Sequence, residues 1–235
     1  MSERMKVVFE FTKTGNMIFI SHLDLTRLFL RVLRMSGLRP EYSQGFNPHP
    51  KMSFALPLAV GIHSVCELLE FETDRNISID EVREAAEKAN ERLPEGVRVT
   101  SAREKPESLS RPLASYVSAA GYEFMCEGIV KAPGLLEDFF GRESVIVKKT
   151  DKKTRTETEK DVRADMLDYT IIKDMRGRML AGVTLSAKPG QTLNPAVFFD
   201  AFCNASGIAR EALSPVITRT SILDAGGKAL REMLE

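Results

Sequence analysis

The chain of 235 residues has few cysteines, and Cys66, Cys126 and Cys203 stand far apart. Such scattered thiols form no CxxC pair, no zinc-ligand spacing and no disulfide framework, which favours a reducing compartment. The N-terminal segment MSERMKVVFEF has no long apolar run, and no stretch approaches the length of a transmembrane helix. The sequence therefore predicts a cytoplasmic protein that does not use a membrane as its partner.

The chain also lacks net charge, because 33 Lys and Arg residues balance 33 Asp and Glu residues. This balance argues against a protein that coats nucleic acid with its whole surface. The charge is nevertheless unevenly distributed along the chain. Residues 1–60 hold eight basic and four acidic residues, a formal charge of +4, whereas residues 61–110 hold seven and twelve, a formal charge of −5. A local basic surface near the N-terminus is therefore compatible with the neutral total.

Motifs of common enzyme classes are missing. The sequence has no GxxxxGK[ST] loop, no GxGxxG turn and no GxSxG elbow. No HxH or HxxxH pair and no neighbouring cysteine suggests a metal site, so we expect no metal and no cofactor. Among the three histidines, His22 and His49 are the candidates for acid–base work on RNA, since a neutral imidazole can accept a proton from a 2′-hydroxyl. The alternative for each is a local capping or packing hydrogen bond, and we predict no catalytic residue.

Periodic patterns predict a β-α-β-β-α-β order in the first half of the chain. A strand at KVVFEFTK precedes a helix that Ser21 caps and Gly37 ends, and a second helix begins at Ser78 with Glu81 completing a capping box. Two further extended segments lie between the helices, and GVRVTSARE follows the second helix as a strand. This order is that of a ferredoxin-like unit.

The second half repeats the order less clearly, with a possible additional strand. We expect the polar tract at residues 148–161 to be a solvated hairpin or a mobile loop. We therefore predict an α+β fold of two tandem ferredoxin-like (βαββαβ) units with antiparallel sheets. The expected boundaries are an N-terminal unit at 1–105, a linker at 106–115, a C-terminal unit at 116–224, and a C-terminal helix or tail at 225–235.

The first helix has a basic face, because Arg27, Arg31 and Arg34 recur at offsets of four and three. Arginine suits two-point contact with phosphate, and Lys51 lies shortly after the loop that follows the helix. We predict that these four cations contact RNA phosphates. The alternative is an ordinary solvated helix surface.

That loop, YSQGFNPHP at residues 42–50, cannot be regular helix because its prolines fix φ and lack an N–H donor. We interpret it as a rigid recognition surface. The residues expected to shape it are Gly45, Phe46, Pro48 and Pro50. The residues expected to contact base edges or riboses are Gln44, Asn47 and His49. For Phe46 we favour a role as an anchor in the core over stacking on a base.

The stretches TKTG, ISHLDL and YSQGFNPHPKMSFA followed by PLAVG together resemble the radical-SAM-linked protein family, a domain of unknown function. The resemblance is strongest over residues 10–65 and weaker at LNPAVFFDAF and VITRTSI. Members of that family are fused behind a radical SAM module or encoded near one. The resemblance therefore implies a radical SAM protein as partner, and this chain lacks the CxxxCxxC triad that would hold the cluster of such an enzyme.

These observations lead to one functional hypothesis with two alternatives. We predict an accessory binding module without catalytic activity of its own, which holds tRNA or rRNA for modification by a separate radical SAM protein. The first alternative is a metal-independent endoribonuclease-like enzyme that uses His22 or His49. The second is a protein that only docks a radical SAM enzyme and contacts no RNA.

Overall fold

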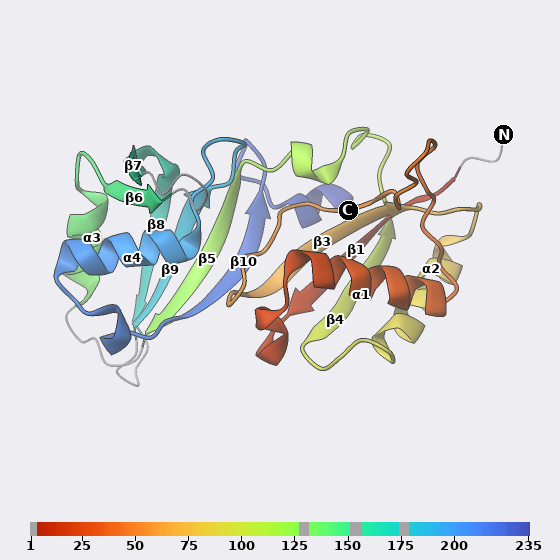
Figure 1. The fold of residues 1–235 in the computed structure, drawn as a ribbon, viewed down its shortest axis with the longest axis horizontal. Helices are drawn as coiled ribbons and strands as arrows, with labels where there is room; N and C mark the ends of the chain where they lie inside the picture. Colours follow the sequence, from red (N-terminus) through yellow and green to blue (C-terminus); the bar gives the residue numbers. More distant parts are fainter. Residues whose placement is uncertain (1–3, 127–131, 151–156, 174–178) are drawn as a thin grey trace. The chain divides into compact units, whose positions relative to one another are not determined.

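The computed structural model describes residues 4–126, 132–150, 157–173 and 179–235 (Figure 1). Its contacts divide the chain into two compact units. Unit 1 consists of Met1–Ser118 and Arg219–Glu235, and unit 2 consists of Ala119–Thr218. Both units combine helices with antiparallel strands in a β-α-β-β-α-β succession, which confirms the predicted fold class.

Unit 1 has the strand order of a ferredoxin-like fold. Its elements are β1 (Lys6–Lys13), the 3-10 helix η1 (Gly15–Phe19), α1 (His22–Met35), β2 (Met52–Phe54), β3 (His63–Glu72), α2 (Ile79–Asn90) and β4 (Val97–Glu104). The strands lie in the order β4-β1-β3, and β2 pairs with β3. Every one of these pairings is antiparallel. The succession predicted from the sequence is therefore present in unit 1.

The core of unit 1 follows from alternation in β1 and helical spacing in α1. Phe9 and Phe11 are buried on the face of β1 that packs with the helices, and the rings of Phe11 and Phe29 of α1 lie 4.7 Å apart. The Ser21 side chain accepts a hydrogen bond from the Asp24 amide at 3.1 Å, which fixes the start of α1. Gly37 follows the helix with φ of +88°, a left-handed conformation that ends it.

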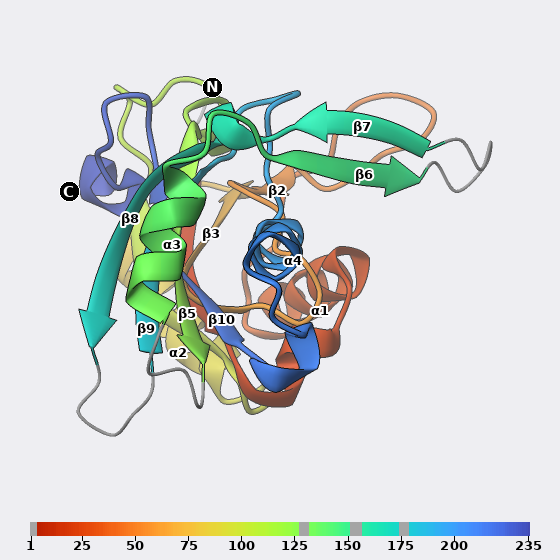
Figure 2. The same cartoon turned by 90° about the vertical axis from the view of Figure 1, so that its left-hand side faces the viewer.

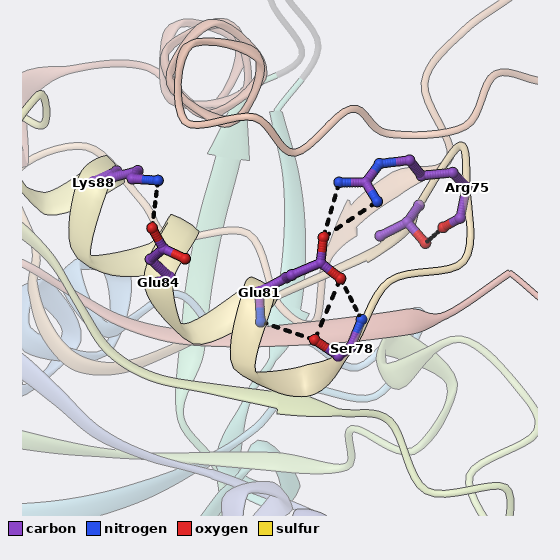
Figure 3. Close-up of polar contacts among 6 residues, drawn as sticks. Arg75, Ser78, Glu81, Glu84 and Lys88 are labelled. Carbon is purple, nitrogen blue, oxygen red and sulfur yellow. Dashed lines mark hydrogen bonds and ion pairs between the residues drawn. The ribbon is translucent and has the colours of Figure 1, made fainter.

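Local side-chain contacts define the start of helix α2 and pair charges on its surface (Figure 3). The Ser78 hydroxyl accepts from the Glu81 amide at 3.2 Å, and the Glu81 carboxylate accepts from the Ser78 amide at 2.8 Å, which completes the predicted capping box. Arg75 also donates to Glu81, and Lys88 pairs with Glu84 at 2.6 Å. The carboxylates of Glu81 and Glu84 are therefore engaged in local pairs on the helix surface.

Segments after β4 and at the end of the chain both belong to unit 1. The Glu70 carboxylate of β3 accepts from the Lys105 ammonium at 2.5 Å and from the Leu113 amide at 2.8 Å. Leu230 and Leu234 of the final 3-10 helix, η5 (Leu230–Leu234), are buried. Residues 106–115, expected as a linker, and residues 225–235, expected as a helix or tail, thus lie within this unit.

Unit 2 repeats the succession with one insertion. Its elements are β5 (Ala119–Cys126), α3 (Ala132–Phe140), β6 (Ile146–Thr150), β7 (Glu157–Asp161), β8 (Met166–Lys173), β9 (Met179–Ser186) and α4 (Pro195–Ser206), with β10 (Val216–Leu223) beginning in unit 2 and ending in unit 1. β9 pairs antiparallel with both β5 and β8. β6 and β7 form a separate antiparallel ribbon between α3 and β8 along the chain (Figure 2). This ribbon accounts for the described ends of the polar tract at 148–161, and residues 151–156 lie outside the described part.

The core of unit 2 is rich in phenylalanine. Phe139 of α3 packs its ring against Phe198 and Phe202 of α4 at centroid distances of 5.7 and 5.6 Å. Asn194 caps α4 by accepting from the Ala196 amide at 2.8 Å. The described residues contain no helix of the length and apolarity needed to cross a membrane.

Candidate nucleic-acid interface in unit 1

Hydrogen bonds at its base hold the loop at residues 42–50 in a closed shape. Tyr42 and Pro50 pair as an isolated bridge, and the Ser43 amide donates to the His49 carbonyl at 2.8 Å. The His49 amide donates to the Ser43 hydroxyl at 3.1 Å, and that hydroxyl lies 2.9 Å from His49 Nδ1. Residues 44–48 therefore form an exposed tip on a polar base, which agrees with the view of the loop as a shaped surface.

The tip itself presents an aromatic ring to solvent. Phe46 has a relative exposure of 112%, so the predicted anchor role in the core is wrong. The physical reason is that the polar bonds between Ser43 and His49 direct the tip away, while Phe54 of β2 fills the adjacent core. Gly45 has φ of +123° and open space where a Cβ would lie, so it supplies a backbone conformation that disfavours other residues.

A hollow of about 640 Å³ lies between the end of α1 and one side of the loop, and we name it the Arg34 hollow. Its lining residues are Arg34, Arg39, Pro40, Glu41, Tyr42, Ser43, Gln44, Pro48 and Asp74. Arg34 donates to the Tyr42 hydroxyl, and its guanidinium carbon lies 5.7 Å from the centroid of that ring. Glu41 is paired with Arg4 at 2.6 Å. Within the described residues neither Arg34 nor Arg39 has a carboxylate partner, and Asp74 is the acidic group that opposes them.

A second hollow, of about 460 Å³, adjoins the other side of the loop base, and we name it the Lys51 hollow. Its basic and polar lining residues include Lys6, His49, Lys51, Ser53, Lys105 and Ser110. Lys51 pairs with Glu72 at 2.8 Å, and Lys105 pairs with Glu70. Lys6 has no ion-pair partner in the described part of the chain. The hollow thus combines three ammonium groups with two carboxylates.

The basic face of α1 does not enter these hollows as a whole. Arg27 pairs with Asp24 at 3.3 Å, and Arg31 is exposed, but neither lines the Arg34 hollow. The structure brings Arg34 and Gln44 together and places Lys51 with His49 in the other hollow. The four cations predicted to contact phosphates therefore do not share one hollow, since Arg34 and Lys51 line different hollows and Arg27 and Arg31 line neither.

Several contributors to the hollows were not predicted from the sequence, among them Lys6, Arg39, Tyr42 and Lys105. Arg39 lies two residues after Gly37, where the helix ends, and this short spacing could have indicated that Arg39 lies close to Arg34. Lys6 reaches the Lys51 hollow because its position in β1 lies opposite Glu72 in the neighbouring strand β3. The sequence alone does not reveal this strand register.

The two histidine candidates occupy different surroundings. His22, in the first turn of α1, packs edge-on against the Phe54 ring at 5.1 Å and lines neither hollow. His49 is hydrogen-bonded to Ser43 at the base of the loop, and we name these bonds the clamp. Among the described side chains no group of three or more His, Cys, Asp or Glu could hold a metal ion. The hollows and the loop tip present guanidinium, ammonium, amide and aromatic groups, which suit the binding of phosphates and bases, together with carboxylates that offset part of the positive charge.

Comparison with known proteins places the chain in a family. One solved chain, from the "Crystal Structure of a Cbf5-Nop10-Gar1 Complex", aligns with a TM-score of 0.47 and 9% sequence identity, covering 92% of this chain and 48% of that chain. This chain thus spans about half the length of that one, and the likeness supports no functional conclusion. No curated protein matches the sequence. Residues 6–195 match the family described as "Uncharacterized protein conserved in bacteria (DUF2344)", and the chain belongs to this family.

Proposed function

We propose that unit 1 binds RNA through the Arg34 hollow and the exposed loop tip. The observation that carries this proposal is the position of two arginines without a carboxylate partner in the described residues, in one hollow with Tyr42 and Gln44. Phe46 stands at the tip of the same loop, fully exposed. Cations for phosphate and an aromatic face for a base are the groups that RNA-binding surfaces combine.

Each group has a distinct role in this proposal. The guanidinium groups of Arg34 and Arg39 donate to phosphate oxygens, and Arg34 is oriented for this by Tyr42. Phe46 stacks on a base, and the amides of Gln44 and Asn47 contact base edges or riboses. Asp74 lowers the positive potential of the hollow, so we expect binding that is moderate in strength and sensitive to salt.

We further propose that the chain serves as an accessory module, which holds tRNA or rRNA for a separate radical SAM protein. This partner is proposed on the resemblance carried by TKTG, ISHLDL and YSQGFNPHPKMSFA. Co-purification of the two proteins after nuclease treatment tests the partnership without relying on RNA as a bridge.

The RNA proposal is tested by filter binding of bulk tRNA to the wild type and to the double variant Arg34→Gln/Arg39→Gln. A matched control is Arg83→Gln/Lys88→Gln, which removes two exposed cations of α2 that pair with Asp80 and Glu84. We expect the first variant to bind much more weakly than the wild type and the control to bind as the wild type does. For single strands, each phosphate contact contributes about −0.7 to the slope of log K against log salt, so the loss of two contacts should reduce the slope by about 1.4. Wild-type binding by Arg34→Gln/Arg39→Gln would refute the proposal.

A further inference from the structure

The loop base is a partition between the Arg34 hollow and the Lys51 hollow. Tyr42 and Ser43 line the first, whereas Pro50, which lies opposite Tyr42 in the bridge, and His49, which is hydrogen-bonded to Ser43, line the second. Pro48 lines the Arg34 hollow and Lys51 the other, so the lining changes from one hollow to the next within residues 48–51. A polymer that passes from one hollow to the other over residues 48–51 therefore crosses this loop.

Cationic groups are available on both sides of the partition. Arg34 and Arg39 line one side, and Lys6 and Lys51 line the other. The Lys51 ammonium forms an ion pair with Glu72 at 2.8 Å, which fixes its position and weakens its attraction for an anion. Lys6 is exposed and, in the described residues, lacks an ion-pair partner. The second hollow is thus the weaker anion site, with Lys6 as its main attraction.

Phe46 lies at the tip, beyond the partition, with both faces of its ring accessible to a ligand. A base can stack on such a ring only if it has left its own helical stack. The bases of an A-form duplex are stacked on one another, and side chains reach such a duplex through its backbone and grooves. The clamp between Ser43 and His49 fixes the loop before binding, so the ring is presented at low entropic cost.

We propose that the ligand of this surface is an unpaired RNA strand that crosses the loop. Its backbone lies on Arg34 and Arg39 at one side, one base stacks on Phe46, and the continuing backbone lies on Lys6 and Lys51. This inference rests on the proposed function and adds the strandedness of the ligand and a second phosphate subsite in the Lys51 hollow.

The test is fluorescence anisotropy with a labelled oligouridine of about 12 nucleotides, free and annealed to its complement, since single-strand sites span about 4–16 nucleotides. We expect the free strand to bind more tightly than the duplex. Phe46→Ala should weaken binding of the strand by about tenfold, as expected for one stacked base, and should leave duplex binding unchanged. Because Phe46 is fully exposed, this variant removes no core contact.

The second subsite is tested with Lys6→Gln/Lys51→Gln, with Arg83→Gln/Lys88→Gln as the control. We expect the first variant to weaken binding of the strand and to reduce its salt slope by up to about 1.4, and the control to leave both unchanged. Equal or tighter binding of the duplex, or unchanged strand binding by Phe46→Ala or by Lys6→Gln/Lys51→Gln, would overturn the inference. RNA binding through the Arg34 hollow would still stand if Arg34→Gln/Arg39→Gln abolished binding, whereas unchanged strand binding by Phe46→Ala would also remove the stacking role from the proposed function. A wild-type protein that binds neither strand nor duplex would overturn both.

Discussion

Replacing Arg219 by methionine should destabilise unit 1, because this arginine is the centre of a buried polar network. The Arg219 and Glu67 side chains are only 3% and 2% exposed, and their nearest N and O atoms lie 2.9 Å apart. Arg219 also donates to the carbonyls of Leu56 and Pro57 at 3.0 and 2.9 Å, in the segment that follows β2. It therefore connects β10 to β3 and to the chain just after the candidate site.

The size of the effect follows from what remains after the substitution. At an effective dielectric constant of about 20, the pair attraction at this distance is on the order of 6 kcal/mol, most of which offsets the desolvation of the two charges. Removing one partner leaves a buried charge without its counterpart, which costs about 3–5 kcal/mol. Lys13 is buried nearby, and desolvation lowers its pKa while the Glu67 carboxylate opposes that shift.

The position of Lys13 predicts an order between two variants. In Arg219→Met the Lys13 ammonium partly compensates Glu67, so we expect a loss near 3 kcal/mol. In Glu67→Gln two buried cations lose their carboxylate, so we expect a loss near 5 kcal/mol. Urea denaturation followed by circular dichroism measures both, with Arg83→Met as an exposed control that should change stability by no more than about 0.5 kcal/mol. Losses below about 1 kcal/mol for both variants, or a greater loss for Arg219→Met, would refute this reasoning.

Four further predictions concern other parts of the chain. Gly96→Ala should lower the unfolding free energy by about 1–3 kcal/mol, because φ is +95° and the new Cβ would lie 2.4 Å from the Thr14 carbonyl oxygen; a urea midpoint equal to that of the wild type would contradict it. Ser78→Ala should cost about 1 kcal/mol through loss of the α2 cap. Hydrogen bonding from the Ser78 amide lowers the pKa of Glu81. The ionised Glu81 therefore stabilises the folded protein at neutral pH, and this contribution is lost as the pH falls through the lowered pKa. Glu81→Gln should reduce the dependence of the unfolding free energy on pH in the acid range. Burial raises the pKa of Cys66 to about 12, so Ellman's reagent should modify this thiol only on unfolding, and rapid modification of the native protein would show that it is accessible.

Most of the fold could be predicted because local patterns and tertiary packing agree. The alternation of Val7, Phe9 and Phe11 indicated a strand with one buried face, and Ser21 and Ser78 marked helix starts that the structure confirms. The return of the chain end to unit 1 had no such signal. Burial of Leu230 depends on contacts with residues distant in sequence, and a short 3-10 helix that carries Arg231 and Glu232 resembles a tail in composition.

The candidate site was predicted only in part, because local patterns indicate some of its residues and tertiary contacts bring in the others. Arg34 and Gln44 were found from helix spacing and loop composition, whereas Lys6 joins through strand register. Phe46 shows a further limit, since an aromatic residue shortly before two prolines can fold into a core or project from it. Here the bonds between Ser43 and His49 decide the outcome, and they depend on the closed shape of the loop.

Photo-crosslinking of thiouridine-containing RNA to the full chain, followed by tryptic digestion and mass spectrometry, tests the central claim most directly. Trypsin should release the loop within the peptide spanning residues 35–51, because the bond between Arg39 and Pro40 resists cleavage. We predict crosslinks in this peptide, centred on Tyr42 and Phe46. In Arg34→Gln/Arg39→Gln the loop is released within residues 32–51, because the cleavage site at residue 34 is lost, and we expect no crosslinks in that longer peptide. Crosslinks confined to unit 2, or none in wild type, would contradict the account.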